Sequence, residues 1–256
     1  MAVLAHPDDE SLGIGGTLAK YASEGADVCV LTATRGDGGR YQEYRPGDPQ
    51  HPGAEALANI RERELRAAAS VLGVRDVAFL DYRDQHLDRA NPREAIAAIV
   101  AHLRRVQPDV VITFGPDGAY GHPDHVAISQ LATAAIVAAA DPAIAKLYYI
   151  AWPASTWAVY ESAFKKLTAK VDGVERQVVP WPDWEITTVI DTRRFAPAVS
   201  RAIACHESQM SVYTQLQKLS ADEYETLLGV QSFYRVFSTV NGGRARETDL
   251  FEGIAP

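Results

Sequence analysis

The first sixteen residues constrain the fold of this chain more than any other stretch. Residues Ala2–Ala5 form a short apolar run of the kind that ends a buried strand. His6, Asp8, Asp9 and Glu10 follow directly, and a helical pattern of apolar residues begins after them. Ligands of open α/β sheets bind outside the carboxyl ends of the strands. The stretch therefore predicts a strand, a site at its end, and a helix that leaves the site.

His6 and Asp9 carry groups that zinc prefers, since imidazole nitrogens and carboxylate oxygens bind this ion at about 2.0–2.2 Å. Pro7 restricts its own φ and favours an extended backbone at His6, which stiffens the turn between them. Asp8 lies between the two ligands and is either free to act as a base or caps the following helix. A catalytic zinc usually has three protein ligands. The motif therefore requires a further ligand elsewhere in the chain.

A second segment supplies that ligand. The apolar run Val110–Phe114 is followed by Tyr120-Gly121-His122-Pro123-Asp124-His125 and then by a helical pattern. The His-Pro-Asp core thus appears twice, each time between an expected strand and an expected helix. At this spacing either His122 or His125 could face the metal. Together the two segments predict a shared metal site at one edge of the sheet.

The two motifs resemble those of the PIG-L/LmbE-like family of zinc-dependent N-deacetylases. The similarity is strong at Ala5–Glu10 and His122–His125, and weaker at Arg61–Leu65, Tyr82–Asp84 and Thr248–Phe251. Members of this family remove acetyl groups from N-acetylglucosamine-containing molecules, including precursors of mycothiol, of bacillithiol and of lipid anchors. The resemblance implies a metal-dependent hydrolase that acts on a small amino-sugar substrate or its conjugate.

The resemblance also implies the metal ligands and the base. It assigns His6, Asp9 and His125 to the metal, which leaves a fourth position open for hydrolysis. Zinc is the expected ion, although such a site also suits iron(II) or another divalent metal. Asp8 is the expected general base, which takes a proton from the attacking water.

Two further side chains are expected to act on the reacting amide. His122 is then free to stabilise the oxyanion as an imidazolium, or to protonate the leaving amine. Tyr120 is expected to donate a hydrogen bond to the same oxygen; otherwise it is an aromatic residue at the rim of the pocket. One such donor typically changes the rate by about 10²–10³.

The remaining candidates are expected around these groups. Arg61 and Asp84 are the candidates for substrate binding, with a surface ion pair or a helix cap as the alternative. Asp124 is expected to orient His122 or a metal ligand from behind, or to serve as a plain helix cap. Glu10 is expected in the same outer layer or in the first helical turn. His206 is interpreted first as a residue at a helix C-terminus, with a role in the site as the alternative.

The order of the expected elements predicts an α/β protein with a Rossmann-like, mostly parallel sheet, helices on both faces, and a smaller, less regular C-terminal portion. The expected strands are Ala2–Ala5, Val28–Thr34, Val77–Leu80, Val110–Phe114, Leu147–Trp152, Ile186–Ile190 and Phe233–Thr239. The expected helices are Ser11–Ser23, Ala54–Leu72, Pro92–Val106, Val126–Ala139, Arg193–Cys205 and Asp222–Leu228. We expect residues 1–256 to form a single deacetylase domain, with a hairpin or lid inserted around residues 153–184, which hold three of the four tryptophans.

Composition excludes several other classes of protein. With 256 residues, of which 47% are hydrophobic, the chain can bury a full core. Its net charge of −8 argues against a nucleic-acid partner. Cys29 and Cys205 are expected to be buried, reduced thiols, which suits the cytoplasm. No apolar run approaches the roughly 20 residues of a membrane span. No leader precedes the first strand, although one could have been trimmed, and a homo-oligomer is left open.

Two alternative functions use the same residues. The first is an amidase that cleaves a larger amide, as in mycothiol S-conjugates, and differs only in the size of the pocket. The second is a non-catalytic carbohydrate-binding relative that keeps the metal. A binder has no use for a base beside the water, so the presence of Asp8 and His122 favours an enzyme.

Overall fold

The computed structural model describes residues 1–141, 143–164, 168–171, 174–177, 180–243 and 245–255. Seven described strands form one sheet in the order β3-β2-β1-β4-β5-β9-β8. They are β1 (Ala2–Leu4), β2 (Cys29–Thr34), β3 (Asp76–Tyr82), β4 (Val110–Phe114), β5 (Lys146–Ile150), β8 (Thr188–Asp191) and β9 (Val230–Ser238). The first five strands in this order are parallel, whereas β9 is antiparallel to β5 and β8 is antiparallel to β9.

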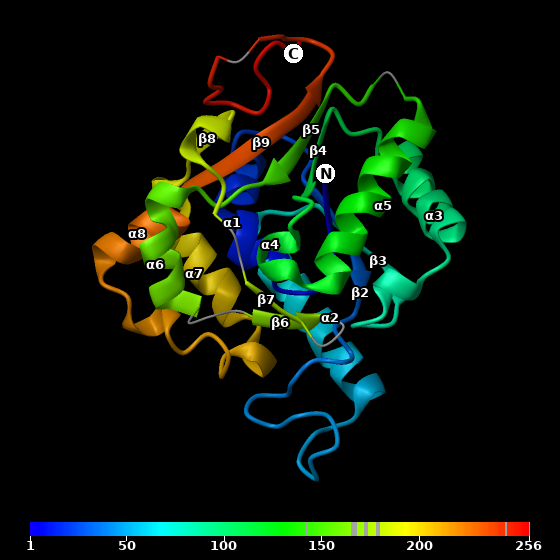
Figure 1. Cartoon of the computed structure of the whole chain (residues 1–256), viewed down its shortest axis with the longest axis vertical. Helices are drawn as coiled ribbons and strands as arrows, with labels where there is room; N and C mark the ends of the chain where they lie inside the picture. Colours follow the sequence, from blue (N-terminus) through cyan, green and yellow to red (C-terminus); the bar gives the residue numbers. More distant parts are fainter. Residues whose placement is uncertain (142, 165–167, 172–173, 178–179, 244, 256) are drawn as a thin grey trace.

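Helices cover both faces of this sheet (Figure 1). The longer helices are α1 (Asp9–Ser23), α2 (Ala54–Leu72), α3 (Pro92–Val106), α5 (Pro123–Ala139), α6 (Trp157–Phe164), α7 (Ala196–Ala204) and α8 (Ala221–Leu228). Helices α3 and α5 pack together on one face, and α1, α2 and α7 pack together on the other. The expected α/β class, with a mostly parallel sheet and helices on both faces, is confirmed.

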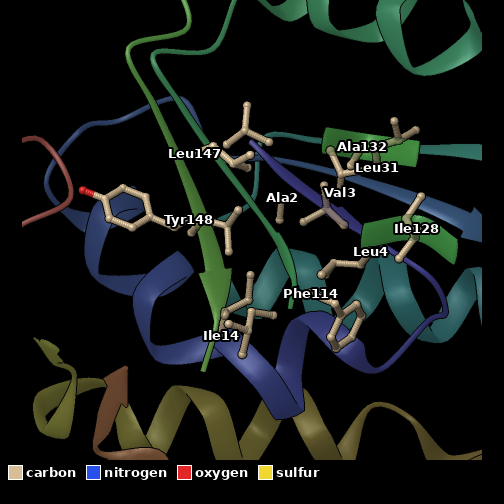
Figure 2. Packing of buried hydrophobic residues seen from close by; sticks show 14 of the residues in the cluster. Ala2, Val3, Leu4, Ile14, Leu31, Phe114, Ile128, Ala132, Leu147 and Tyr148 are labelled. Carbon is tan, nitrogen blue, oxygen red and sulfur yellow. The ribbon is translucent and has the colours of Figure 1, made fainter. Parts of the chain in front are cut away.

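The core lies around the central strands. Strands β1, β2 and β4 are buried along their whole length, because helices cover both faces. Figure 2 shows Leu4 and Phe114 beside Ile14 of α1 and Ile128 of α5. These strands therefore have nearly continuous apolar sequences, which is why the sequence predicts them.

The sheet topology brings the two His-Pro-Asp segments together. Strand β1 lies between β2 and β4 and pairs with β4 at Ala2 and Ile112. From β1 the chain continues to β2 on one side, and from β4 it continues to β5 on the other. Such a switch point is where ligands bind in doubly wound folds. The turn that follows β1 carries His6, and the first turn of α5, the long helix that follows β4, carries His125.

The less regular second half differs most from the expectation. The short helix α6 occupies part of the region expected as a hairpin or lid, and a hairpin follows it, formed by β6 (Thr168–Val171) and β7 (Val174–Gln177). Residues 165–167, 172–173 and 178–179 of that region lie outside the described residues. The role of this region as a lid, and the division of the chain into one domain, stay predictions.

Smaller differences concern element ends and one thiol. Helix α7 is preceded by a 3₁₀ turn at Arg193–Phe195, where one continuous helix was expected. Cys29 is buried as expected, but Cys205 is half-buried, so that prediction was wrong for the second thiol. Both cysteines are free. Within the described ranges, no helix has the length and apolar character that a membrane crossing requires.

Candidate metal centre

The turn after β1 is held by the carboxylate of Asp9. Its Oδ2 accepts hydrogen bonds from the backbone N–H groups of Ala5, at 3.1 Å, and His6, at 2.8 Å. Asp8 adopts φ 104° and ψ −26°, in the left-handed region that is strained for a non-glycine residue. Its side chain makes no capping hydrogen bond to α1, so the capping alternative does not hold. The backbone instead turns Asp8 away from its helix.

Three ligand groups converge at the ends of β1 and β4. His6 Nδ1 lies 3.1 Å from His125 Nε2, which lies 3.3 Å from Asp9 Oδ1. The other oxygen of Asp9, Oδ2, lies 3.8 Å from His6 Nδ1. Four ligands placed tetrahedrally around zinc at 2.0–2.2 Å would be about 3.4 Å apart. The three groups are therefore spaced as ligands of one ion would be.

The outward nitrogens of both rings have acceptors of their own. His6 Nε2 lies 3.0 Å from Asp84 Oδ1 and 3.1 Å from Asp124 Oδ2. His125 Nδ1 lies 3.2 Å from the carbonyl oxygen of Gly118, to which it donates. With the protons on these outward nitrogens, the lone pairs of His6 Nδ1 and His125 Nε2 face each other. Two lone pairs and a carboxylate oxygen around one point form a donor set that fits a divalent cation.

The neighbouring carboxylates also determine how strongly this point holds positive charge, whether as a proton on His6 or as a cation in its place. Burial acts to lower the pKa of His6, but Asp84 and Asp124 outweigh it and raise that pKa well above its usual value. Burial acts to raise the pKa of Asp9, yet His125 and His6 hold it well below the usual range. The pKa of Asp84 is lowered in the same way by His6, against its burial. The carboxylates stay ionised, so the site attracts positive charge.

Asp8 lies beside the ligands, and one oxygen of its carboxylate is bound by two donors. Its Oδ2 accepts from Arg61 Nη2 at 2.9 Å and from Tyr213 Oη at 2.5 Å, and its backbone N–H donates to Glu10 Oε2 at 2.9 Å. Burial raises the pKa of Asp8 although Arg61 opposes it. A carboxylate near the ligands with a raised pKa has the proton affinity that a general base needs.

Arg61, a predicted substrate contact, is buried and tied to the protein. Besides Asp8, its guanidinium donates to the carbonyl oxygens of Pro7 and Gly36. These bonds indicate that Arg61 holds Asp8 in place. Its predicted contact with a substrate stays untested, as does that of Asp84.

His122 and Tyr120 lie against the rings of the converging ligands. His122 caps α5, with its Nδ1 accepting from the backbone N–H of Asp124 at 3.2 Å, so the ring proton lies on Nε2. Burial and the neighbouring His6 and His125 lower the pKa of His122 to about 3. This lowered pKa favours a neutral ring that donates from Nε2, and the expected role of His122 toward the oxyanion or the amine stays a prediction. The Tyr120 ring lies edge-on to His125, 5.2 Å between centroids.

A second ligand set stays open in the geometry. His122 lies with His6 and His125 in one group whose ligand atoms are within 4.8 Å of each other. His6, Asp84 and Asp124 form another such group. In the second group, however, His6 would use Nε2, and Asp124 also accepts from the backbone N–H groups of Gln85 and Leu87. Both oxygens of Asp124 thus already accept hydrogen bonds from the backbone. The point between His6 Nδ1 and His125 Nε2 is therefore the better cation site.

The structure adds Tyr213 and Glu64, which the sequence did not single out as site residues, and it gives His206 a partner in the site. Tyr213 reaches Asp8 from the segment after α7. His206 is buried and lies 2.8 Å from Glu10 Oε1, so it belongs to the layer behind Asp8 and is not merely a helix-terminal residue. Glu64 binds Ser208 of the same segment. The weaker similarity of Arg61–Leu65 to the family was a signal for Glu64, whereas no motif pointed to Tyr213.

A cavity of about 220 Å³ opens above these groups. Its lining combines the ligands and Asp8 with aromatic and aliphatic side chains. The lining residues other than His6, Asp8, Asp9, His122 and His125 are Leu12, Gly13, Gly39, Arg61, Asp84, Gln85, Phe114, Ala119, Tyr120, Trp152, Tyr160, Gln209, Val212 and Tyr213. The arrangement suits a small molecule that presents one polar group to the ligands.

Known proteins resemble this chain in sequence and in fold. Proteins named 1D-myo-inositol 2-acetamido-2-deoxy-alpha-D-glucopyranoside deacetylase from Rhodococcus erythropolis and Streptomyces avermitilis are each 36% identical to it. The alignments cover 99% and 100% of this chain and 97% of each relative.

Two solved structures share the fold. The N,N'-diacetylchitobiose deacetylase of Pyrococcus horikoshii has a TM-score of 0.58 at 21% identity, over 92% of this chain and 82% of that chain. The 4-carboxy-2-hydroxymuconate hydratase of Pseudomonas putida has a TM-score of 0.66 at 19% identity, over 95% of this chain and 98% of that chain. At such identities the likeness concerns the fold alone.

The family is given by sequence. A family model described as PIG-L, GlcNAc-PI de-N-acetylase, matches residues 1–136, more than half of the chain, and includes both His-Pro-Asp segments. Together with the relatives aligned over nearly the whole length, this match shows that the chain belongs to the PIG-L family of de-N-acetylases.

Proposed function

We propose that the protein hydrolyses the N-acetyl amide of an N-acetylglucosamine-containing small molecule, with His6, Asp9 and His125 holding a divalent cation. The relatives' names make the inositol glycoside of N-acetylglucosamine the first substrate to consider. One observation carries the proposal. His6 Nδ1, His125 Nε2 and Asp9 Oδ1 converge on one point while the outward nitrogens of both rings have acceptors of their own, and the carboxylate of Asp8 lines the same cavity.

In the proposed mechanism a divalent cation held by His6, Asp9 and His125 would polarise the amide carbonyl and ease the loss of a proton from water. Asp8 accepts that proton as the water oxygen attacks the carbonyl carbon. His122 donates its Nε2–H, and Tyr120 its hydroxyl, to the carbonyl oxygen as negative charge develops there. The C–N bond then breaks, and Asp8 returns the proton to the departing amine. The products are acetate and the free amino sugar.

The outer residues support these groups. Asp84 and Asp124 hold the proton on His6 Nε2 and so present Nδ1 as a ligand. Arg61 donates to the side chain of Asp8, and Glu10 accepts a hydrogen bond from the backbone N–H of Asp8. We propose that the part of the substrate beyond the sugar ring packs against the aromatic residues of the cavity lining, such as Trp152.

Zinc is the proposed ion, because an imidazole pair and one carboxylate are ligands that it prefers. Metal analysis of purified protein, followed by comparison of zinc with iron(II), tests this choice. The proposed compartment is the cytoplasm, and the supporting observation is that neither cysteine is in a disulfide. Cell fractionation tests it.

The direct test is acetate release from a panel of amides. The panel holds N-acetylglucosamine, its inositol glycoside, chitobiose and a larger thiol-conjugate amide, each with zinc and with a chelator. Zinc-dependent acetate release supports the deacetylase. Cleavage of the larger amide alone, detected as its free amine with no acetate released, would instead favour an amidase on larger conjugates.

Asp8→Ala separates an enzyme from a binding protein. The variant should keep its metal and lose most of its rate, whereas a binder has no turnover to lose. The proposal fails if chelation and zinc return leave hydrolysis of every amide in the panel unchanged.

A further inference from the structure

Two stretches of sequence that the proposed mechanism does not use meet in the structure. The carboxylate of Glu64, one turn beyond Arg61 on α2, is nearly buried. It accepts the backbone N–H of Ser208 at 2.7 Å and the Ser208 hydroxyl at 2.7 Å. A nearly buried carboxylate with two donors from one residue is a strong local clamp. It attaches the segment after α7 to the helix that carries Arg61.

The same segment is also tied to the long loop after β2. The Ser208 carbonyl oxygen accepts the N–H of Gln42 at 2.6 Å, and Gln209 Nε2 donates to the carbonyl oxygen of Arg40 at 2.7 Å. The segment therefore has partners on two sides. A short distance along the chain it delivers Tyr213, which is buried.

The side chain of Tyr213 reaches the proposed base, Asp8. Its hydroxyl lies 2.5 Å from Asp8 Oδ2, the same oxygen that pairs with Arg61 Nη2 at 2.9 Å. Among the described residues, Asp8 Oδ1 has no such donor. A carboxylate with two donors on one oxygen cannot rotate to exchange its oxygens without losing both bonds. This asymmetry leaves Oδ1 as the oxygen that can take a proton.

We propose that Tyr213 is a positioning residue for Asp8, held in place by the clamp between Glu64 and Ser208. The inference rests on the proposed function, because it concerns the orientation of the proposed base. Arg61 donates a charged hydrogen bond to Asp8 Oδ2, and the Tyr213 hydroxyl donates to the same oxygen from a different direction. Together the two bonds fix the plane of the carboxylate. Catalysis depends on such placement to within a fraction of an ångström.

Tyr213→Phe tests the proposal, because it keeps the ring and removes the hydroxyl. We expect kcat to fall roughly 10- to 100-fold, with KM and zinc content unchanged. The matched control is Tyr149→Phe, which removes a tyrosine hydroxyl contact of 2.9 Å to Thr133 outside the cavity. That control should leave kcat unchanged.

A double-mutant cycle separates positioning from general structural support. In an Asp8→Ala background, Tyr213→Phe should change kcat by less than about twofold, because the group that it positions is gone. Equal losses in both backgrounds would overturn the proposal. So would a rise in KM at constant kcat, which would make Tyr213 a substrate contact.

Two further measurements keep the test independent of the proposed function. Acetate release by the unaltered enzyme is measured first, and its absence would count against the function and not against Tyr213. The urea unfolding midpoints of metal-free variants give a second cycle, in which the shifts from Tyr213→Phe and Asp8→Ala should be non-additive; additive shifts would refute the contact. If Tyr213→Phe does not fold, Ser208→Ala replaces it with the same expected pattern.

Discussion

Replacing Asp84 by asparagine tests whether this residue serves the metal or the substrate. Asp84 Oδ1 lies 3.0 Å from His6 Nε2, and its Oδ2 accepts the backbone N–H of Gly38 at 3.1 Å. An asparagine has one acceptor and one donor in these two places. Either His6 or Gly38 must then face an N–H group of the new side chain. The substitution removes the negative charge as well as one of the two acceptors.

The magnitude follows from what remains around His6. Loss of a partner behind a metal ligand typically costs about 10- to 100-fold in metal affinity. Asp124 still accepts from His6 Nε2 at 3.1 Å, so we expect the lower end, about tenfold, or about 1.4 kcal/mol. Competition with a chromogenic chelator measures the zinc affinity. Asp27→Asn, at an exposed ion pair with Arg75, is the control.

The alternative role has a different signature. If Asp84 binds the substrate directly, KM rises while zinc affinity stays that of the unaltered protein. That result would refute the reasoning that places Asp84 behind His6.

Three further predictions concern single residues. Asp8→Asn should lower kcat by about 10²- to 10⁴-fold without loss of zinc, measured by acetate release and metal analysis; retained activity would exclude Asp8 as the base. Glu247→Gln should lower the unfolding midpoint. Hydrogen bonds from Asn241 and Lys146 lower the pKa of the buried Glu247 from 4.5 to about 2, against the effect of its burial. The ionised carboxylate therefore stabilises the folded state fully above pH 4.5, and this stabilisation is lost as the pH falls toward 2. A difference in midpoint between the variant and the unaltered protein that does not shrink over this range would contradict the prediction. Gly118→Ala should cost at least about 1 kcal/mol and weaken zinc binding, because Gly118 has φ +60° and a Cβ would lie 2.7 Å from Val126 Cγ2; an unchanged urea unfolding curve would contradict this.

The fold and the centre of the site could be predicted because local patterns encode them. Apolar runs end at His6 and precede the segment that contains His125, and parallel topology brings such strand ends to one edge. The sequence alone therefore predicts that the two His-Pro-Asp segments meet. The expected strands correspond to those of the sheet, with ends that differ by a few residues.

The surroundings of Asp8 could not be predicted in this way. Tyr213 and Asp8 are 205 positions apart, and Ser208 and Glu64 are 144 apart. Their contact depends on where the segment after α7 returns, for which no periodic pattern exists. For Asp124 the sequence left open whether it orients His122 or a metal ligand, and the structure places its carboxylate 3.1 Å from the predicted ligand His6. Long-range side-chain pairing decided these details.

The most direct test of the metal centre is a crystal structure of the zinc-loaded protein with anomalous diffraction at the zinc edge. We predict one ion per chain, within about 2.0–2.2 Å of His6 Nδ1, Asp9 Oδ1 and His125 Nε2. An ion bound instead at His6 Nε2 between Asp84 and Asp124, or no bound ion at stoichiometric zinc, would contradict the account.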